Sequence, residues 1–406
     1  MFRWRKSLAF LAIGATATIT AGCGSSSSSG NSVPQGLTGQ QAQGYVNSQI
    51  SNEDRSAATV LDPQPGSFLH GKTTVSVLGS TTPSNGDENP YAVWPVTHTV
   101  GTVKSGDVLV DDFNNESNDQ GTGTTIVDVH TDGTTSVFAD LPHTVAGCPG
   151  GVGLSTAMVQ LRTGWVIVGS VPSTDGKTDT VGRGCLLVLS PEGKLVSTIT
   201  GSYLNGPWDA TVRDNGDTAT LFVSNTVVGL AHSATAQSSQ GDVVRLSLKQ
   251  TTTSPPTVTA EQTVASGLLE RGDPSAFVKG PTGLAIASNG TLYVADNLSN
   301  RIDGIPNALT RTTTAGTGMT VSSGGQLADP LGLAIAPDGD LIAANAQNGK
   351  LVEITTTGKQ VGEYYAIENT GQDPAGNGDL FGIAINQAGN GILFVKDDEN
   401  VLAELH

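Results

Sequence analysis

One short pattern is written twice in the second half of the chain. The stretch GPTGLAIASNGTLYVADNLSNRI begins at Gly280 and returns 49 residues later as DPLGLAIAPDGDLIAANAQNGKLVEI. Short apolar runs alternate with turns, and Asn289-Gly290 and Asp338-Gly339 supply the positive φ that a β-hairpin turn needs. Each copy therefore predicts a meander of four short strands. Such a sheet is too thin to bury its own faces and must stack on other copies.

Four weaker copies bring the expected number to six. They are recognised by the same order of apolar runs and turns, at intervals of about 50 to 75 residues. Four-stranded units repeated around an axis form a β-propeller. The sequence therefore predicts an all-β protein, a six-bladed β-propeller of four-stranded antiparallel blades. The weaker copies begin at Asn89, Cys148, Gly206 and Asp379, and the prolines that lead five of the six copies are Pro90, Pro149, Pro207, Pro281 and Pro330.

The last copy has only three expected strands before His406, which leaves an unpaired sheet edge. A lone strand-like segment, KTTVSVLG, lies upstream of the first copy at about 72–79. We expect this N-terminal strand to complete the last blade and close the ring. The insertion from Thr251 to Ser275 contains TTTSPP and is expected to form an extended loop.

The first residues indicate export. A basic start and a short apolar run are followed by Cys23 and a run of serines, and the motif TAGC resembles a bacterial lipoprotein signal. The resemblance implies a signal peptide at 1–22 and lipid on Cys23, and hence an exported, membrane-anchored lipoprotein on the periplasmic side of the envelope or at the cell surface. An ordinary secretory signal is the alternative. Residues 23–66 are expected to form a flexible Ser/Gln/Gly-rich tether with one short helix near 40–55, and 67–406 the propeller.

Two further cysteines remain, Cys148 and Cys185. Two thiols in an exported chain favour one disulfide, with two buried free thiols as the alternative. The repeat places both at the same face of the second blade, which supports the bridge. The formal net charge of -17 repels phosphate backbones, so nucleic acid is not an expected partner.

The best-preserved copy resembles the NHL repeat. This resemblance implies a propeller that serves as a binding platform for a small molecule or a partner protein. Related six-bladed propellers include gluconolactonase-like and streptogramin-lyase-like enzymes, which carry a divalent metal at the channel mouth. The matching residues are Pro281, Gly283, Asn289, Gly290, Val294, Asp296, Asn300, Arg301 and Ile302.

Polar side chains are expected at the ends of the second strands, on the face where each innermost strand begins. Their oxygens could hold Ca²⁺ or Mg²⁺. Alternatively, each bonds the backbone of its own turn. The aligned residues are Asp112, Ser170, Asn225, Asp296, Asn345 and Asp397.

Asp209 departs from the repeat, because the last three copies have glycine at its position. A carboxylate at the channel mouth could be a metal ligand or a general base, and Trp208 beside it could stack on a flat ligand. His143 and His232 are expected in loops on the same face and complete the catalytic candidates. The alternative is structural: Asp209 accepts backbone N–H groups and Trp208 packs between blades.

We therefore expect a binding or scaffolding module for a small molecule, a cation or a partner protein at the channel face. The alternative is a metal-dependent lyase or hydrolase with its site at the channel mouth. No short metal-ligand motif such as His-x-His, nucleophile elbow or phosphate loop accompanies these residues.

Overall fold

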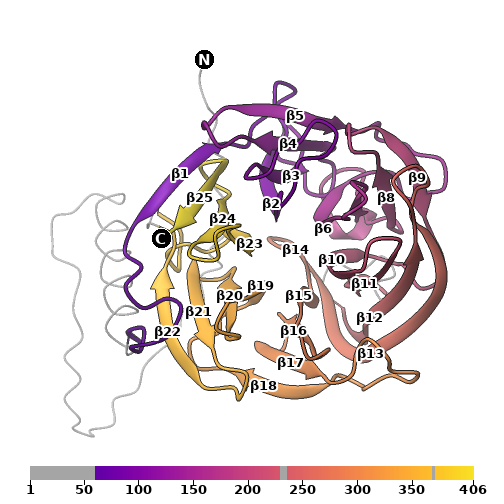
Figure 1. Ribbon diagram of the computed structural model, residues 1–406. Helices are drawn as coiled ribbons and strands as arrows, with labels where there is room; N and C mark the ends of the chain where they lie inside the picture. Colours follow the sequence, from indigo (N-terminus) through magenta and orange to yellow (C-terminus); the bar gives the residue numbers. More distant parts are fainter. Residues whose placement is uncertain (1–59, 229–235, 368–370) are drawn as a thin grey trace, which may run out of the picture. The chain divides into compact units, whose positions relative to one another are not determined.

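Six β-sheets stand in a ring around a central axis (Figure 1). The computed structural model describes residues 60–228, 236–367 and 371–406. The signal peptide, Cys23, the helix near 40–55 and His232 lie outside the described residues. The predicted all-β, six-bladed propeller is confirmed. Within the described ranges no helix is long and apolar enough to cross a membrane.

Each blade is an antiparallel meander whose strands run in chain order from the axis outward, apart from the strand that completes the sixth blade and β14 of the third, which returns towards the axis. Blades 1 to 3 consist of β2 (Glu88–Pro95), β3 (Val108–Asn114), β4 (Thr125–Val129) and β5 (Thr135–Asp140); β6 (Leu154–Gln160), β7 (Val166–Ser170), β8 (Cys185–Leu189) and β9 (Leu195–Ile199); and β10 (Pro207–Asp214), β11 (Thr218–Asn225), β12 (Gln237–Lys249), β13 (Thr257–Asp273) and β14 (Phe277–Lys279).

Blades 4 and 5 have four strands each. Blade 4 consists of β15 (Pro281–Ile286), β16 (Leu292–Asp296), β17 (Arg301–Ile305) and β18 (Met319–Ser323), and blade 5 of β19 (Pro330–Ile335), β20 (Leu341–Asn345), β21 (Lys350–Ile354) and β22 (Gln360–Tyr365). A one-turn 3₁₀ helix, η1 (Thr178–Thr180), follows the second strand of blade 2.

The sixth blade is closed by the N-terminal strand, as predicted. It contains β23 (Leu380–Ile385), β24 (Ile392–Lys396) and β25 (Val401–Leu405), and β1 (Val75–Ser80) pairs antiparallel with β25. The two segments are far apart in sequence and lie side by side in Figure 1. This pairing gives β25 a partner along its outer edge and completes a four-stranded sheet like the others.

The cores lie between neighbouring blades. Six clusters of buried apolar side chains are present, and most join the facing surfaces of two adjacent sheets. The innermost strands come especially close together at Gly283, Gly332 and Gly382. A Cβ atom on Gly283 would lie 2.4 Å from the Leu331 carbonyl oxygen of the next blade, and one on Gly382 would lie 1.9 Å from the Tyr91 carbonyl oxygen. Glycine at these positions therefore lets the innermost strands pack around the axis.

The insertion between Thr251 and Ser275 is mostly strand, so the predicted loop was wrong. Residues 251–256 lie outside the strands, with the Thr251 N–H donating to the Ser254 carbonyl, and a turn at 274–276 ends the insertion. The 17-residue β13 lies between these two segments and pairs with β12 along most of its length, and its β-branched residues suit a strand. Pro149 does not occupy the position of the other leading prolines. In blade 4 the leading Pro281 pairs with Asp296 at the end of the second strand. In blade 2 the residue that makes this pair, with Ser170, is Leu154, five residues after Pro149.

Residues 61–69 run against the fifth blade before the chain reaches β1. The Gln64 N–H donates to the Val361 carbonyl, and the Glu363 N–H donates to the Leu61 carbonyl. The buried Leu69 side chain joins the core between blades 5 and 6. This segment therefore packs on the propeller just ahead of the closing strand.

The predicted disulfide between Cys148 and Cys185 is confirmed. Its Cα atoms are 5.3 Å apart, and both cysteines are buried between blades 1 and 2. Cys185 is the first residue of β8, and Cys148 lies in the loop that leads to β6. The bridge therefore ties the loop before the innermost strand of blade 2 to its third strand.

Replacing both cysteines by alanine should destabilise the protein. In the chain-entropy description, opening a bridge that spans 37 residues costs about 4 kcal/mol. Urea unfolding of Cys148→Ala/Cys185→Ala against the wild type, both without reductant, measures the difference. Adding reductant to the wild type should lower its stability towards that of the variant and leave the variant unchanged. An unchanged unfolding midpoint in the double variant would contradict a stabilising bridge.

Candidate functional site

Five aromatic side chains pack together at the face where the innermost strands begin, which we call the start face. Tyr91 lies 4.4 Å from Phe381 and 4.8 Å from Phe113 between ring centroids, and the Trp208 ring stacks 6.4 Å from that of Phe277. All five are buried. We call this group the aromatic plug. The plug fills the part of the channel at which the sequence suggested a ligand site.

Phe277 reaches the plug from the third blade. It belongs to the short strand β14, which lies near the centre of the ring in Figure 1. Its backbone has a φ of 65°, an uncommon conformation for a non-glycine residue. The Thr178 hydroxyl of η1 donates to the Phe277 carbonyl at 2.5 Å, and Gly121 of the first blade leaves room for the ring. Elements of three blades thus hold Phe277 in place.

The channel remains open beyond the plug. This open part is a cavity of about 360 Å³ that is lined by all six innermost strands. A separate cavity of about 440 Å³ lies between two blades. The walls of the channel cavity extend to Pro95, Ile335 and Ile385, where the innermost strands end in hairpin turns. We call this side the hairpin face. The walls are mainly apolar, with hydroxyl groups from a few threonines and the carboxyl of Asp209.

Asp209 lies at the deep end of this channel cavity, near the plug. Its Oδ2 accepts the Leu284 N–H of the next blade at 2.7 Å, so the side chain bridges blades at the position where the last three copies have glycine. Burial raises the pKa of Asp209 to about 7, and backbone hydrogen bonds from Leu284 and Ala210 oppose part of that shift. The residue is only partly buried, because its free side faces the channel space. It can therefore exchange a proton near neutral pH.

A second carboxyl lies behind the channel wall. Asp111 is fully buried, its Oδ1 accepts the Ala92 N–H at 2.8 Å, and its Oδ2 has no hydrogen-bond partner. Burial raises the pKa of Asp111 to about 8, and the nearby charge of Asp209 contributes to the rise. No residue on the wall of the channel cavity, all of them in the described part of the chain, is basic. The deep end therefore lacks a positive charge from its own wall.

The polar residues predicted at the second-strand ends have partners within their own blades. Asn225 donates to the Tyr203 carbonyl and to Asp242, while Asn345 donates to the Gln326 carbonyl. Asp296 pairs with Arg301 at 3.0 Å. The Ser170 hydroxyl, in the same way, donates to the Gly151 carbonyl. Most of the set thus makes local structural contacts, and none of the six lines the channel cavity.

The sixth blade departs from this alignment by one residue. Leu380 pairs with Lys396, so Lys396, and not Asp397, holds the position of Asp296. Asp112 is fully buried and Asp397 is half-buried, and both carboxylate oxygens of Asp112 lack hydrogen-bond partners. Burial first, and neighbouring carboxylates second, raise the pKa of each well above its usual range.

The other predicted residues lie away from the channel cavity. Trp208 is fully buried in the plug and does not line the cavity. His143 is exposed in the loop after β5, and its carbonyl accepts the Val152 N–H. Sequence reasoning missed Phe277 and Asp111. The apolar pair Phe277-Val278, at the end of a long polar insertion, was the available signal for the first.

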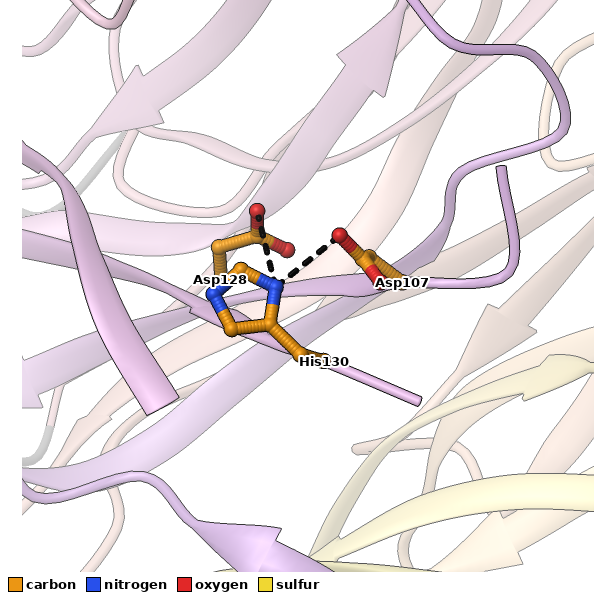
Figure 2. A group of neighbouring side chains, drawn as sticks. All are labelled: Asp107, Asp128 and His130. Atoms are coloured by element: carbon orange, nitrogen blue, oxygen red, sulfur yellow. Dashed lines mark hydrogen bonds and ion pairs between the residues drawn. The ribbon is translucent and has the colours of Figure 1, made fainter. Parts of the chain in front are cut away.

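Sequence reasoning also missed a group formed by Asp107, Asp128 and His130 (Figure 2). It lies in blade 1, beside the cavity between blades 1 and 6. Asp128 and His130 are two residues apart, a spacing that places both side chains on one face of a strand. The spacing of Asp128 and His130 was the signal available in the sequence. The third residue, Asp107, directly precedes the neighbouring strand β3, and nothing in the sequence indicated that it lies beside them.

The fold resembles solved β-propellers at low sequence identity. A gluconolactonase from Xanthomonas campestris has a TM-score of 0.52 and 13% identity, covering 86% of this chain and 95% of its own. A structural-genomics protein provisionally assigned as a gluconolactonase has a TM-score of 0.50 and 13% identity, over 86% and 96%. These likenesses support the propeller fold and assign no activity.

A catalytically inactive virginiamycin B lyase from Staphylococcus aureus, solved with quinupristin, has a TM-score of 0.46 and 16% identity, over 82% of this chain and 85% of its own. That score is too low to carry an argument. No protein-family model and no curated protein matches the sequence. The NHL resemblance therefore stays a prediction from the repeated motif.

Proposed function

We propose that this protein is a binding module whose channel holds a small molecule with an apolar body and a protonated amine. The ligand enters from the hairpin face, because the aromatic plug fills the start face. Pockets for small molecules are commonly apolar with a few well-placed polar groups, and the channel cavity of about 360 Å³ has this character.

The observation that carries the proposal is the uncompensated carboxyl of Asp209 at the deep end. Removing a carboxylate from water is costly unless an opposite charge accompanies it. The channel wall supplies no such charge, and Asp111 adds a second acidic group behind it. An ammonium group on the ligand would supply the missing charge, while the apolar walls would hold the rest of the molecule.

A lyase or hydrolase at the same cavity is the second candidate. The specific observation in its favour is the pKa of Asp209, raised to about 7, which suits a general base. Lactone opening is the reaction named in the descriptions of two structural neighbours. Catalysis would be supported by turnover of a lactone that Asp209→Asn abolishes. The binding proposal is favoured because one carboxyl falls short of the several oxygen ligands that a Ca²⁺ or Mg²⁺ site requires.

We also propose that the propeller is exported and tethered to a membrane through lipid on Cys23. The Cys148–Cys185 disulfide supports an oxidising compartment. A tether between Cys23 and the propeller would keep the channel free to meet ligands outside the cytoplasm.

Small aromatic and alicyclic amines should stabilise the protein at pH 8 more than alcohols of the same carbon skeleton do. At that pH most Asp209 carboxyls are ionised, and a charge-assisted hydrogen bond contributes about 1.5–3 kcal/mol. Thermal-shift titrations with 2-phenylethylamine and 2-phenylethanol provide the comparison. In Asp209→Asn the amine should bind about 10-fold more weakly or worse, since 1.4 kcal/mol corresponds to a factor of ten.

Asp217→Asn is the matched control, because it removes the same charge from an exposed turn of the same blade. It should bind the amine like the wild type. Equal stabilisation by amine and alcohol, or equal amine binding by Asp209→Asn and the wild type, would argue against Asp209 as the counter-ion of the ligand.

A further inference from the structure

The first blade brings one histidine and two aspartates together, away from the channel cavity. β4 ends at Val129, which pairs with Val108, the first residue of β3, so His130 and Asp107 lie next to this pair, just outside the two strands. Asp128 precedes His130 by two residues and faces the same side. Figure 2 shows both carboxylates directed at the His130 ring. One ligand atom from each of the three residues lies within 4.8 Å of the others.

The distances within this group match the spacing of ligands around a small metal ion. His130 Nδ1 is 3.0 Å from Asp107 Oδ2 and 3.6 Å from Asp128 Oδ2. In a tetrahedral zinc site with bonds of 2.0–2.2 Å, ligand atoms lie about 3.3–3.6 Å apart. The two distances from Nδ1 therefore lie within a few tenths of an ångström of this spacing, and the two carboxylate oxygens lie within 4.8 Å of each other.

The second nitrogen of His130 has its own partner. His130 Nε2 lies 3.0 Å from the Ser136 hydroxyl. When Nε2 carries the proton and donates it to this oxygen, Nδ1 presents a lone pair to the two carboxylates. A histidine that ligates a metal typically donates its other N–H in this way. In this tautomer Nδ1 has no proton to donate across its 3.0 Å contact with Asp107 Oδ2, and a cation bound by both atoms would take the place of that proton.

Asp128 gives an independent indication of a missing partner. It is 3% exposed, and its Oδ1 has no hydrogen-bond partner. Asp107 is 2% exposed as well. A buried carboxylate left unpaired at one oxygen is costly unless an ion or a donor completes its surroundings.

The group also has access from outside. The cavity of about 440 Å³ between blades 1 and 6, on the hairpin face, is lined by Asp107 and His130 on one side and by Gln387 and Glu404 on the other. Pro95 is the one residue that it shares with the channel cavity. The His130 side chain is 25% exposed. A metal held by three protein ligands would keep its fourth position open to this space, as catalytic zinc sites do.

The described ranges contain one other acidic group of this kind, Asp338, Asp340 and Glu353, and its buried carboxylate is held by shorter backbone hydrogen bonds. Asp107 accepts the Lys104 N–H at 3.2 Å and the Thr131 N–H at 3.4 Å, and Asp128 Oδ1 accepts none. Both oxygens of Glu353 accept backbone N–H groups, from Phe68 at 2.6 Å and Leu69 at 2.8 Å. Its carboxylate is therefore already satisfied by the N-terminal segment.

We propose that Asp107, Asp128 and His130 form a binding site for a divalent transition-metal ion of the Zn²⁺ class, with an open coordination position facing the cavity between blades 1 and 6. The mixed nitrogen and oxygen ligands suit such an ion better than Ca²⁺, which takes six to eight oxygen ligands. This site is separate from the amine-binding cavity and does not depend on it.

The test uses the tag-free full-length chain, dialysed against a chelator and titrated with Zn²⁺ by calorimetry. We expect one Zn²⁺ per chain from this site, together with a rise in melting temperature. Co²⁺ bound in its place should give the visible absorption of a tetrahedral complex. His130→Gln should lose both signals, and Ser136→Ala, which removes only the partner of Nε2, should weaken Zn²⁺ binding about 10-fold.

His70→Gln is the matched control, because His70 is exposed and lies outside the group, and it should bind Zn²⁺ like the wild type. Melting curves without metal show whether each variant is folded, and amine binding by His130→Gln should be unchanged. Failure of the wild type to bind Zn²⁺ at micromolar concentrations would overturn the proposal. Equal binding by His130→Gln and the wild type would also overturn it.

Discussion

A chain that begins at Thr81 should lose the cooperative unfolding transition of the full-length protein. This truncation removes β1, which exposes the outer edge of β25 along the pairs from Val75–Leu405 to Ser80–Val401. It also removes Leu69 from the core between blades 5 and 6. Each large apolar side chain contributes about 1.5–3 kcal/mol when fully buried, and a typical domain has only about 5–15 kcal/mol in total.

The matched control is a chain that begins at residue 60, which keeps every described strand. Urea unfolding followed by circular dichroism should give one sharp transition for this control and a broad or absent transition for the shorter chain. If the chain beginning at Thr81 unfolds with the same midpoint and the same steepness, closure by β1 does not stabilise the ring.

The protein should also be more stable at pH 5.5 than at pH 8. Asp111, Asp112, Asp209 and Asp397 all have pKa values raised in the folded state, chiefly by burial. The folded protein therefore holds protons that the unfolded chain releases above pH 4 or so. This stabilisation is fully present below the unfolded-state pKa and is lost as the pH rises through the folded-state values, which are about 7 for Asp209 and about 8 for Asp111.

Asp112→Asn isolates one of these groups. Because burial raises the pKa of Asp112 well above its usual range, removing this buried acid should reduce the loss of stability between pH 5.5 and pH 8. The readout is the change in unfolding free energy with pH at constant ionic strength, which cancels any pH-independent cost of the asparagine. Asp217→Asn should leave the slope as it is. A slope that Asp112→Asn leaves unaltered would mean that Asp112 is ionised in the folded protein.

The architecture could be predicted from the sequence because a single local rule repeats. Gly283, Gly332 and Gly382 mark the innermost strands, where neighbouring backbones leave no room for a Cβ atom. The lone strand upstream of the first copy could be matched to the unpaired edge of the last one. The pairing of Cys148 with Cys185 followed from the same register and is confirmed.

The surroundings of the channel could not be predicted in the same way. Phe277 fills the start face only because the long strand β13 brings β14 back to the axis, a path that no repeat specifies. The sequence alignment placed Asp397 at the end of the second strand of blade 6, whereas Lys396 occupies that position in the structure. Asp107 joins Asp128 and His130 across two strands, and such a neighbour depends on register rather than on sequence spacing.

The most direct test of the proposed function is the proton count on ligand binding. Calorimetric titration of 2-phenylethylamine at pH 7, in buffers of different ionisation enthalpy, measures the protons released per ligand bound. At a pKa of about 7 roughly half of the Asp209 carboxyls are protonated, and an ammonium ion should displace those protons. We expect about half a proton released per amine bound by the wild type, and none in Asp209→Asn. Binding without proton release, or the same release from the variant, would contradict a channel site built around Asp209.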